Sequence, residues 1–226
     1  MTRPDTASEE PFTHRLLALL HTGRAVDDLR RYFGMGTAPG VQPFTGSRFE
    51  HLGGGGDRPH VADRVTAEDL VAVQTLSVTV PAPVALDILE GSLGTELSRL
   101  LREIPTGIDM ADVDPSLLGP GSPADQAWHL LCGQHEVGRV IAGKLLARKR
   151  PRLLPVYDRV VRCAVGRPSS FWLSLHAALR EDGGALHDTL TGLRRAAGLP
   201  ESVSALRVCD VIVWMGHRAL RHNCPR

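Results

Sequence analysis

The segment between residues 204 and 221 constrains the fold more than any other stretch, because it is apolar almost all round its predicted helix. Its apolar residues are Leu206, Val208, Cys209, Val211, Ile212, Val213, Trp214 and Met215. Such a helix is normally buried in the centre of a domain, so we expect other helices to surround it. Its one acid, Asp210, we interpret as part of a structural ion pair or helix-to-helix hydrogen bond; the alternative is a buried carboxyl with a raised pKa.

The remaining chain carries further helical patterns, separated by glycine and proline. Thr66, Ser122 and either Ser169 or Ser170 are predicted N-caps, since their side chains can accept a hydrogen bond from the first turn. The β-branched residues at 76–80 leave a strand as an alternative there. The spacing of apolar residues predicts helices over 13–32, from 66 to near 80, 84–103 as one helix or two, 122–132, 139–148, from 158 onward, from 170 to near 182, and 185–197.

Composition agrees with an all-α fold of about eight helices. Only 4% of the 226 residues are aromatic, so the core must consist mostly of Leu, Val and Ala, which favour helices. The length allows one large domain or two small lobes. We expect residues 1–12 to form a disordered tail and residues 13–226 a single helical domain.

Cysteine and histidine spacing predicts neither a metal nor another cofactor. The four cysteines form no C-x-x-C pair, and the ten histidines show no ligand spacing. We expect the cysteines to be reduced, and those within apolar helical runs to be buried. The polar start and the lack of any apolar run near about 20 residues predict a cytoplasmic protein with no membrane partner.

The segment 34–62 is rich in glycine and proline and poor in periodicity. A loop of this length is either functional or partly disordered. Within it, Gly53–Gly56 and Asp57 invite interpretation as a phosphate cradle. No G-K-[ST] follows these glycines, so a flexible surface loop is the preferred interpretation.

The segment from Arg139 to Arg167 is strongly basic. It contains nine Lys and Arg against one acid, Asp158, which gives +8, so the remainder of a chain of net charge +1 sums to −7. Such asymmetry points to an anionic partner, for which duplex DNA is our candidate. The alternative for the run at 149–152 is a plain solvated loop.

Several residues of this region resemble the helix-hairpin-helix DNA glycosylase superfamily. Val137, Gly138 and Arg139 match the second half of the hairpin, Ala142 matches the small position of the following helix, and Pro155 and Asp158 match the segment with the catalytic aspartate. The resemblance covers about thirty residues. The whole chain, including TGSRFEHLGGGGDRP and LRVCDVIVWM, is also similar to an actinobacterial family of uncharacterised proteins.

The glycosylase resemblance implies two helical lobes around a cleft and a DNA site at the hairpin. It implies that Asp158 stabilises the charge that develops on the sugar as the N-glycosidic bond of a flipped base breaks. Tyr157 is the candidate for the base pocket. The residues expected to bind DNA are Val137, Gly138, Arg139, Lys144, Lys149, Arg150 and Arg152.

The sequence departs from the family at the hairpin, where Gln134, His135 and Glu136 replace its Leu-Pro-Gly. Val140 occupies the position of the lyase lysine, so any activity would be monofunctional. Three alternatives remain open. Asp158 can serve only as a helix N-cap. The chain can be a non-catalytic binding module that keeps the fold, or a protein that binds a small molecule or another protein through the 34–62 loop.

Overall fold

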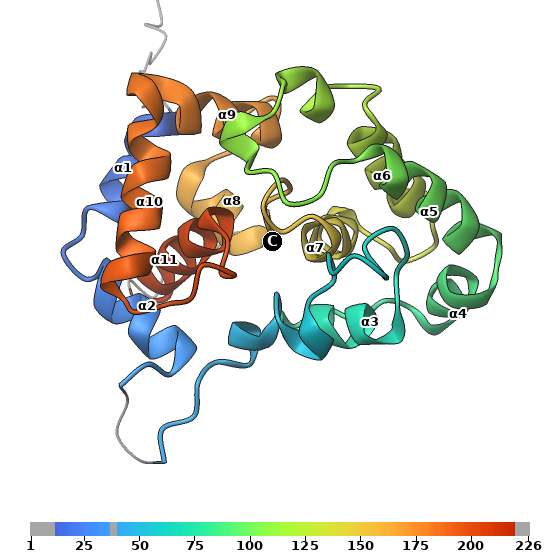
Figure 1. Cartoon of the computed structure of the whole chain (residues 1–226), viewed down its shortest axis with the longest axis horizontal. Helices are drawn as coiled ribbons and strands as arrows, with labels where there is room; N and C mark the ends of the chain where they lie inside the picture. The colour runs from blue at the N-terminus through green and yellow to red at the C-terminus, as the bar shows by residue number, and fades with distance from the viewer. Residues whose placement is uncertain (1–11, 37–39, 220–226) are drawn as a thin grey trace, which may run out of the picture.

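The computed structural model describes residues 12–36 and 40–219, and Figure 1 shows that they are folded into helices. The tail predicted for residues 1–12 lies outside the described residues, except for Phe12. The described residues, 12–36 and 40–219, contain eleven α-helices, five short 3-10 helices and no strand. The strand alternative at 76–80 is therefore wrong. The all-α class is confirmed.

The α-helices outnumber the predicted eight partly because the segment predicted as one helix over 13–32 forms two, and the segment 84–103, predicted as one helix or two, also forms two. The segment 13–32 is broken at Gly23, where φ is 69°, and the segment 84–103 is broken at Gly91. The α-helices are α1 Phe12–Leu20, α2 Ala25–Phe33, α3 Ala67–Gln74, α4 Ala82–Glu90, α5 Ser92–Glu103, α6 Pro123–Cys132, α7 Arg139–Lys149, α8 Arg159–Val165, α9 Phe171–Arg180, α10 Ala185–Ala196 and α11 Ala205–Ala219. The 3-10 helices are η1 Thr45–Arg48, η2 Leu52–Gly54, η3 Met110–Asp112, η4 Pro115–Leu118 and η5 Glu181–Gly184.

The predicted helix starts are confirmed by side-chain caps. Thr66 and Asp69 form a reciprocal capping box at α3. The hydroxyl of Ser122 accepts a hydrogen bond from Asp125 N, and that of Ser170 accepts one from Leu173 N. Each cap satisfies a backbone N–H group that has no partner inside its helix.

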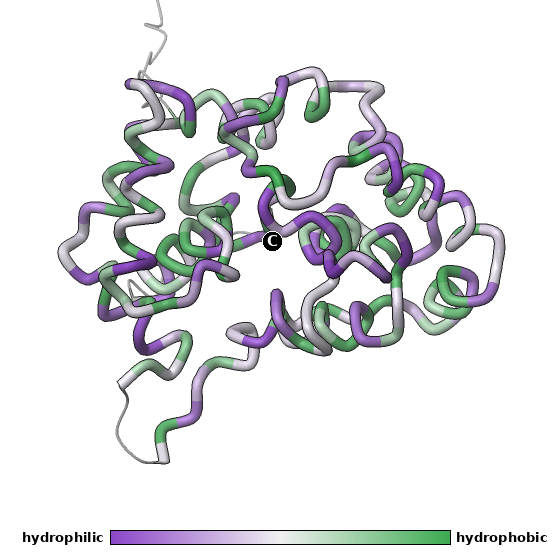
Figure 2. The backbone as a smooth tube through the Cα atoms, in the orientation of Figure 1, coloured by the Kyte–Doolittle hydropathy of each residue, from purple (hydrophilic) through white to green (hydrophobic). Residues whose placement is uncertain are grey.

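The α-helices pack as two groups, which lie on the left and right of Figure 1. The first group joins α1 and α2 to α8–α11, and the second contains α3–α7. In the first group, α11 packs against α1, α2, α8 and α10, and Val208, Val211 and Ile212 are fully buried. Figure 2 shows hydrophobic residues along much of α11. The prediction that this helix lies inside the domain is confirmed.

The basic run at the end of α7 points inward. Arg148 and Lys149 are fully buried, and both bind the buried carboxylate of Asp69. Arg148 Nε lies 2.8 Å from Asp69 Oδ1, and Lys149 Nζ lies 2.9 Å from Asp69 Oδ2. Burial lowers the pKa of Lys149, and the Asp69 carboxylate opposes that shift. The interpretation of this run as a solvated loop is therefore wrong, since its charges are compensated inside the protein.

These cations hold the glycine-rich loop in place. Arg148 donates hydrogen bonds to the carbonyl oxygens of Phe49 and Leu52, and Lys149 donates to that of Gly56 at 2.6 Å. Glycine is required at position 56 because a Cβ there would collide with the carbonyl oxygen of Arg148. The predicted flexible surface loop is instead tied to α7 by its backbone, and these glycines approach a guanidinium and an ammonium rather than a phosphate.

Glu50 ties the same loop to the start of α11. Its carboxyl oxygens accept hydrogen bonds from Ser204 Oγ at 2.6 Å and from Ser204 N at 3.1 Å. Burial raises the pKa of Glu50 to about 7, although the bonds from Ser204 and the charge of Arg207 oppose the shift. The folded protein therefore binds this proton more tightly than the unfolded chain does.

This raised pKa predicts a pH-dependent stability. The contribution of the protonated Glu50 is fully present below the unfolded pKa of 4.5 and is lost as the pH rises through about 7. Relative to Glu50→Gln, the wild-type free energy of unfolding is expected to fall by about 3 kcal/mol between pH 4.5 and 8, at roughly 1.4 kcal/mol per pKa unit. Urea unfolding of both proteins across this range measures the difference. The exposed Glu201→Gln is the control, and parallel pH profiles for wild type and Glu50→Gln would contradict the prediction.

Candidate functional site

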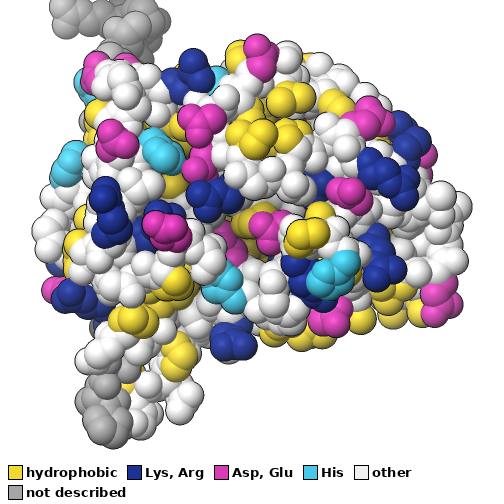
Figure 3. All heavy atoms as spheres, viewed as in Figure 1, with side chains coloured by type: hydrophobic (Ala, Val, Ile, Leu, Met, Phe, Trp, Pro, Cys, Tyr) yellow, Lys and Arg dark blue, Asp and Glu magenta, His cyan; other side chains and the backbone are white. Residues whose placement is uncertain are grey.

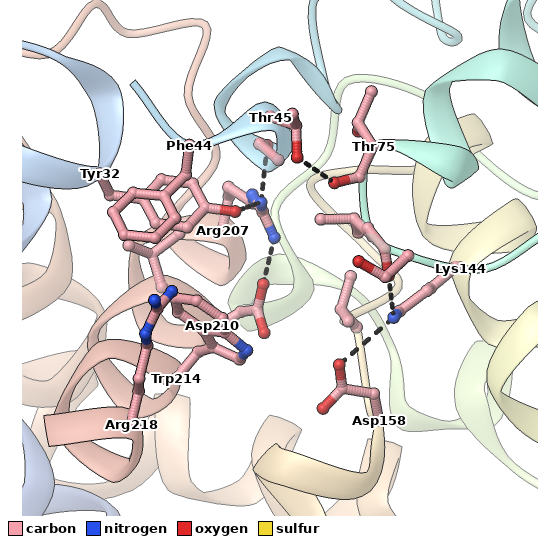
Figure 4. Close-up of a pocket in the computed structure, with 15 residues that line it drawn as sticks. Tyr32, Phe44, Thr45, Thr75, Lys144, Asp158, Arg207, Asp210, Trp214 and Arg218 are labelled. Carbon is pink, nitrogen blue, oxygen red and sulfur yellow. Dashed lines mark hydrogen bonds and ion pairs between the residues drawn. The ribbon is translucent and has the colours of Figure 1, made fainter. Parts of the chain in front are cut away.

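A pocket of about 270 Å³ lies between the two helical groups, and Figure 4 shows the side chains around it. Its walls come from α2 and α11 on one side, from α7 and the segment after α3 on the other, and from Phe44 with the start of η1 and the segment before α8. The lining residues are Tyr32, Phe44, Thr45, Gly46, Thr75, Leu76, Ser77, Lys144, Val156, Asp158, Arg207, Asp210, Val211, Trp214 and Arg218.

One face of α11 forms a complete wall of the pocket. The lining positions on this helix are 207, 210, 211, 214 and 218, and this recurrence about once per helical turn places them on one side of the helix. Arg207 is buried, and its Nη2 donates hydrogen bonds to Tyr32 Oη at 2.6 Å and to the carbonyl oxygen of Gly46 at 2.8 Å. Glycine is required at position 46 because a Cβ there would collide with Tyr32 Oη. Arg207 therefore holds this wall against the 34–62 segment.

Asp210 forms an ion pair with Arg207 through its Oδ2, which confirms the interpretation made from the sequence. Burial also raises the pKa of Asp210 to about 6, and the Arg207 charge opposes this shift. Both properties weighed for this residue are thus present together. The sequence does not reveal that this carboxyl faces a pocket rather than the packed interior.

Asp158 lies on the opposite wall with Lys144. Its Oδ1 accepts hydrogen bonds from Val160 N at 2.9 Å and Val161 N at 3.1 Å, so it is the N-cap of α8. Its Oδ2 lies 3.3 Å from Lys144 Nζ, and that ammonium also donates to the carbonyl oxygen of Leu76 at 2.9 Å. Capping occupies only one carboxylate oxygen, and the side chain still lines the pocket (Figure 4).

Three aromatic rings line the pocket on the side of α2 and α11. The rings of Tyr32 and Phe44 are stacked, with centroids 5.3 Å apart, and Trp214 packs edge-on against both. Burial raises the pKa of Tyr32. Aromatic residues are scarce in the sequence, yet three of them meet at this pocket. Their spacing along the chain does not predict that they come together.

Tyr157, the predicted base-pocket residue, does not line this pocket. Its ring stacks on that of Phe171 with centroids 3.9 Å apart, and its hydroxyl donates to the carbonyl oxygen of Gly166 at 2.8 Å. The extended segment before α8 places neighbouring side chains on opposite sides, so Tyr157 and Asp158 diverge. The aromatic residues that share the pocket with Asp158 are Tyr32, Phe44 and Trp214, on the opposite wall.

The cations predicted to bind DNA lie in different surroundings in the structure. Lys144 lines the pocket and pairs with Asp158. Lys149 and Arg150 are fully buried, and Arg150 donates to carbonyl oxygens such as those of Ile104 and Ala62. Neither side chain is available to a phosphate in this conformation. Arg152 pairs with Asp109, at 3.2 Å between Nε and Oδ1.

The hairpin keeps only part of its predicted surface. Val137 is buried, and Gly138 is the N-cap residue of α7. Arg139 is exposed, and its guanidinium lies over the Trp128 ring at 5.8 Å. Glu136 adopts a φ of 60° and is exposed, so a carboxylate stands beside the hairpin where the glycosylase motif has glycine.

The surface charge is mixed on the face that Figure 3 shows. Lys and Arg side chains alternate there with Asp and Glu, and no expanse of one sign covers this face. Of the nine basic residues from Arg139 to Arg167, four are buried, namely Lys144, Arg148, Lys149 and Arg150. The net charge of this segment therefore overstates the positive charge that a partner can meet.

Within the described ranges, no three His, Cys, Asp or Glu side chains gather closely enough to hold a metal ion. None of the described helices combines the length and apolar character that a membrane crossing requires. Cys132 and Cys209 are free thiols, and Cys209 is buried as predicted. Cys163 is exposed, which corrects the expectation for that residue.

The fold and site define a helical protein with a polar, partly aromatic pocket between two helical groups. Over residues 25–217 the chain matches the model of DUF6308, described as a family of unknown function, and the protein belongs to this family. No curated protein and no solved structure gives a significant match. The expected similarity to an uncharacterised family agrees with this result, whereas the glycosylase resemblance gains no support from it.

Proposed function

We propose that the pocket holds a nucleobase and that the protein is a monofunctional DNA N-glycosylase of helix-hairpin-helix type, with Asp158 as its catalytic residue. The observation that carries the proposal is the position of Asp158. Its carboxylate caps α8 through one oxygen, directs the other to Lys144, and lines a pocket whose opposite wall is aromatic. Planar rings and a fixed carboxylate are what a flipped nucleotide requires.

The chemistry assigned to Asp158 is electrostatic. As the C1′–N bond breaks, its electron pair leaves with the base and positive charge develops on the sugar, and a carboxylate fixed nearby stabilises that charge. Water then adds to C1′ and restores a neutral sugar after losing a proton. Two backbone N–H groups and the Lys144 ammonium hold the carboxylate in one orientation, so little reorganisation is needed during the reaction.

The surroundings of Lys144 support a monofunctional reaction. Its ammonium is engaged by Asp158 and by the carbonyl oxygen of Leu76, and the side chain is buried. A lyase step needs a free amine that attacks C1′ to form a Schiff base. In this arrangement the Lys144 ammonium forms an ion pair with Asp158 and is not positioned as a nucleophile.

A second candidate function is the binding of a free heteroaromatic small molecule. The burial of Lys144, Arg148, Lys149 and Arg150 favours it, because buried cations cannot contact the phosphates of DNA. The pocket also receives Phe44, Thr45 and Gly46 from the 34–62 segment. Its 270 Å³ lies just below the range of about 300–1,000 Å³ that is usual for ligand sites, which favours a single ring system over a larger ligand.

The experiment that separates the two candidates is binding to a short duplex, with and without an abasic-site analogue, over a salt titration. Glycosylase function predicts tight binding that prefers the abasic duplex. Five of the nine basic side chains of residues 139–167 are not buried, so this segment is expected to contribute no more than about −4.5 to the slope of log K against log salt, at about −0.9 per phosphate. Salt-dependent binding that ignores the lesion favours a non-catalytic module, and no binding at low salt excludes the DNA function.

A further inference from the structure

The charges inside the pocket are not all compensated by the protein. Five charged side chains line it, and four of them form two ion pairs, Lys144 with Asp158 and Arg207 with Asp210. The fifth is Arg218, for which the described part of the chain offers no acidic partner within ion-pair distance. The lining therefore carries a net charge of +1, and this charge is located on Arg218.

Arg218 differs from Arg207 in exposure and in its partners. Arg207 is buried, and its donors are used by Tyr32, Gly46 and Asp210. Arg218 is exposed, and its guanidinium lies over the rings of Phe44 at 5.1 Å and Trp214 at 5.2 Å. Stacking on two rings restricts the guanidinium plane and leaves the N–H groups at its edge for an external acceptor.

Figure 4 shows how these groups are arranged across the pocket. Arg218 and Trp214 lie on the α11 side, with Phe44 nearby, and Asp158 and Lys144 lie on the opposite side. A ligand between the walls meets the carboxylate of Asp158 with one end and the guanidinium of Arg218 with the other. A neutral base alone satisfies neither the net charge of the pocket nor the free edge of Arg218.

We propose that the pocket is a nucleotide site, in which Arg218 binds the phosphate attached to the sugar of the base that the pocket holds. This inference rests on the proposed function for the presence of a base. A planar guanidinium matches the geometry of phosphate oxygens and binds them through paired, charge-assisted hydrogen bonds. The phosphate can belong to a DNA strand or to a free mononucleotide, since both present the same group next to the sugar.

The test compares ligands with and without the phosphate charge. The DNA probes are the abasic duplex and versions with one methylphosphonate on either the 5′ or the 3′ side of the abasic site. The small probes are the four 2′-deoxynucleoside 5′-monophosphates and the corresponding nucleosides. The variants are Arg218→Gln, which removes the charge, and Arg218→Lys, which keeps the charge without the planar fork. Arg195→Gln, at an exposed position of α10 outside the pocket lining, is the matched control.

Arg218→Gln is expected to weaken binding of a phosphate-bearing probe about 10- to 100-fold, the effect of losing a charge-assisted hydrogen-bonded pair. It is expected to have no further effect on the duplex in which the contacted phosphate is neutral, or on the nucleoside. Arg218→Lys should recover part of the loss, and Arg195→Gln should bind as the wild type does. Equal losses for charged and neutral probes, or no loss for either, would overturn the inference.

The two sets of probes separate the failure of this inference from the failure of the proposed function. Binding of mononucleotides that depends on Arg218, without any binding of the duplex, supports the nucleotide site and rejects base excision from DNA. A preference for the abasic duplex that is unchanged in Arg218→Gln rejects the role of Arg218 and retains the proposed function. If the wild type binds neither kind of probe, both are rejected.

Discussion

Replacement of Asp158 by Asn is expected to reduce base release by about 100- to 1,000-fold, the range seen when one electrostatic contact to a transition state is removed. Asparagine caps helices about as well as aspartate, so its side-chain oxygen can keep the bonds from Val160 N and Val161 N. The negative charge opposite the sugar is lost. Base release under single-turnover conditions, from any lesion duplex that the wild type processes, measures the effect.

Binding of the abasic duplex is the accompanying measurement, because it reports whether the pocket remains formed. We expect it to change little in Asp158→Asn. The control is Asp114→Asn, since Asp114 also accepts a bond from a backbone N–H at a helix start but lies outside the pocket lining. Equal base release by Asp158→Asn and the wild type would remove Asp158 from the mechanism and leave its capping role.

Replacement of Asp69 by Ala is expected to lower the free energy of unfolding by about 3–5 kcal/mol, the cost of removing one partner from a buried ion pair. The Asp69 side chain is 1% exposed and is shared by Arg148 and Lys149. Its loss leaves two buried cations without their carboxylate and also removes the acceptor for Thr66 N at the start of α3. Urea unfolding monitored by circular dichroism measures the change.

Asp63 provides a matched control because it also contacts a buried cation. Asp63 Oδ1 lies 2.8 Å from Arg150 Nη2, the same separation as between Asp69 and Arg148. Its side chain is 45% exposed, and Arg150 keeps several carbonyl acceptors. Asp63→Ala is therefore expected to cost no more than about 1 kcal/mol. Equal losses in the Asp63 and Asp69 variants would show that burial does not govern the strength of these contacts.

Local signals in the sequence predicted the helices well. Thr66, Ser122 and Ser170 act within one helical turn, so their caps can be recognised without knowledge of tertiary structure. The apolar α11 also reveals its burial directly. The division of 84–103 was one of the two predicted alternatives, whereas the division of 13–32 at Gly23 was not predicted, because a glycine alone does not specify that a helix ends.

The charge pattern misled because sequence records the sign of a side chain but not its direction. Arg148, Lys149 and Arg150 occupy consecutive positions, which normally indicates a solvated run. Here they bind Asp69 and the carbonyl oxygens of the 49–62 segment, which lie roughly 80 to 100 residues away in the chain. The sequence does not indicate which carbonyl oxygens accept these hydrogen bonds, because every residue has the same backbone carbonyl group.

The candidate site was only half visible in the sequence. Asp158 and Lys144 were selected, and they do meet at one wall of the pocket. The opposite wall combines Tyr32, Phe44 and the polar stripe of α11 from three distant segments. The available signal was the spacing of the charged residues Arg207, Asp210 and Arg218, which interrupt an apolar helix on a single face.

The joining of α1 and α2 to α11 has a consequence for the order in which the protein folds as it leaves the ribosome. Tyr32 and Arg207, which bind each other across the pocket wall, are 175 positions apart. Helices α3–α7 pack largely among themselves and are synthesised well before α11. We therefore expect the second group to form first, while the apolar faces of α1 and α2 remain uncovered on the nascent chain. The pocket is then a late product of synthesis, completed only when α11 emerges and closes the first group.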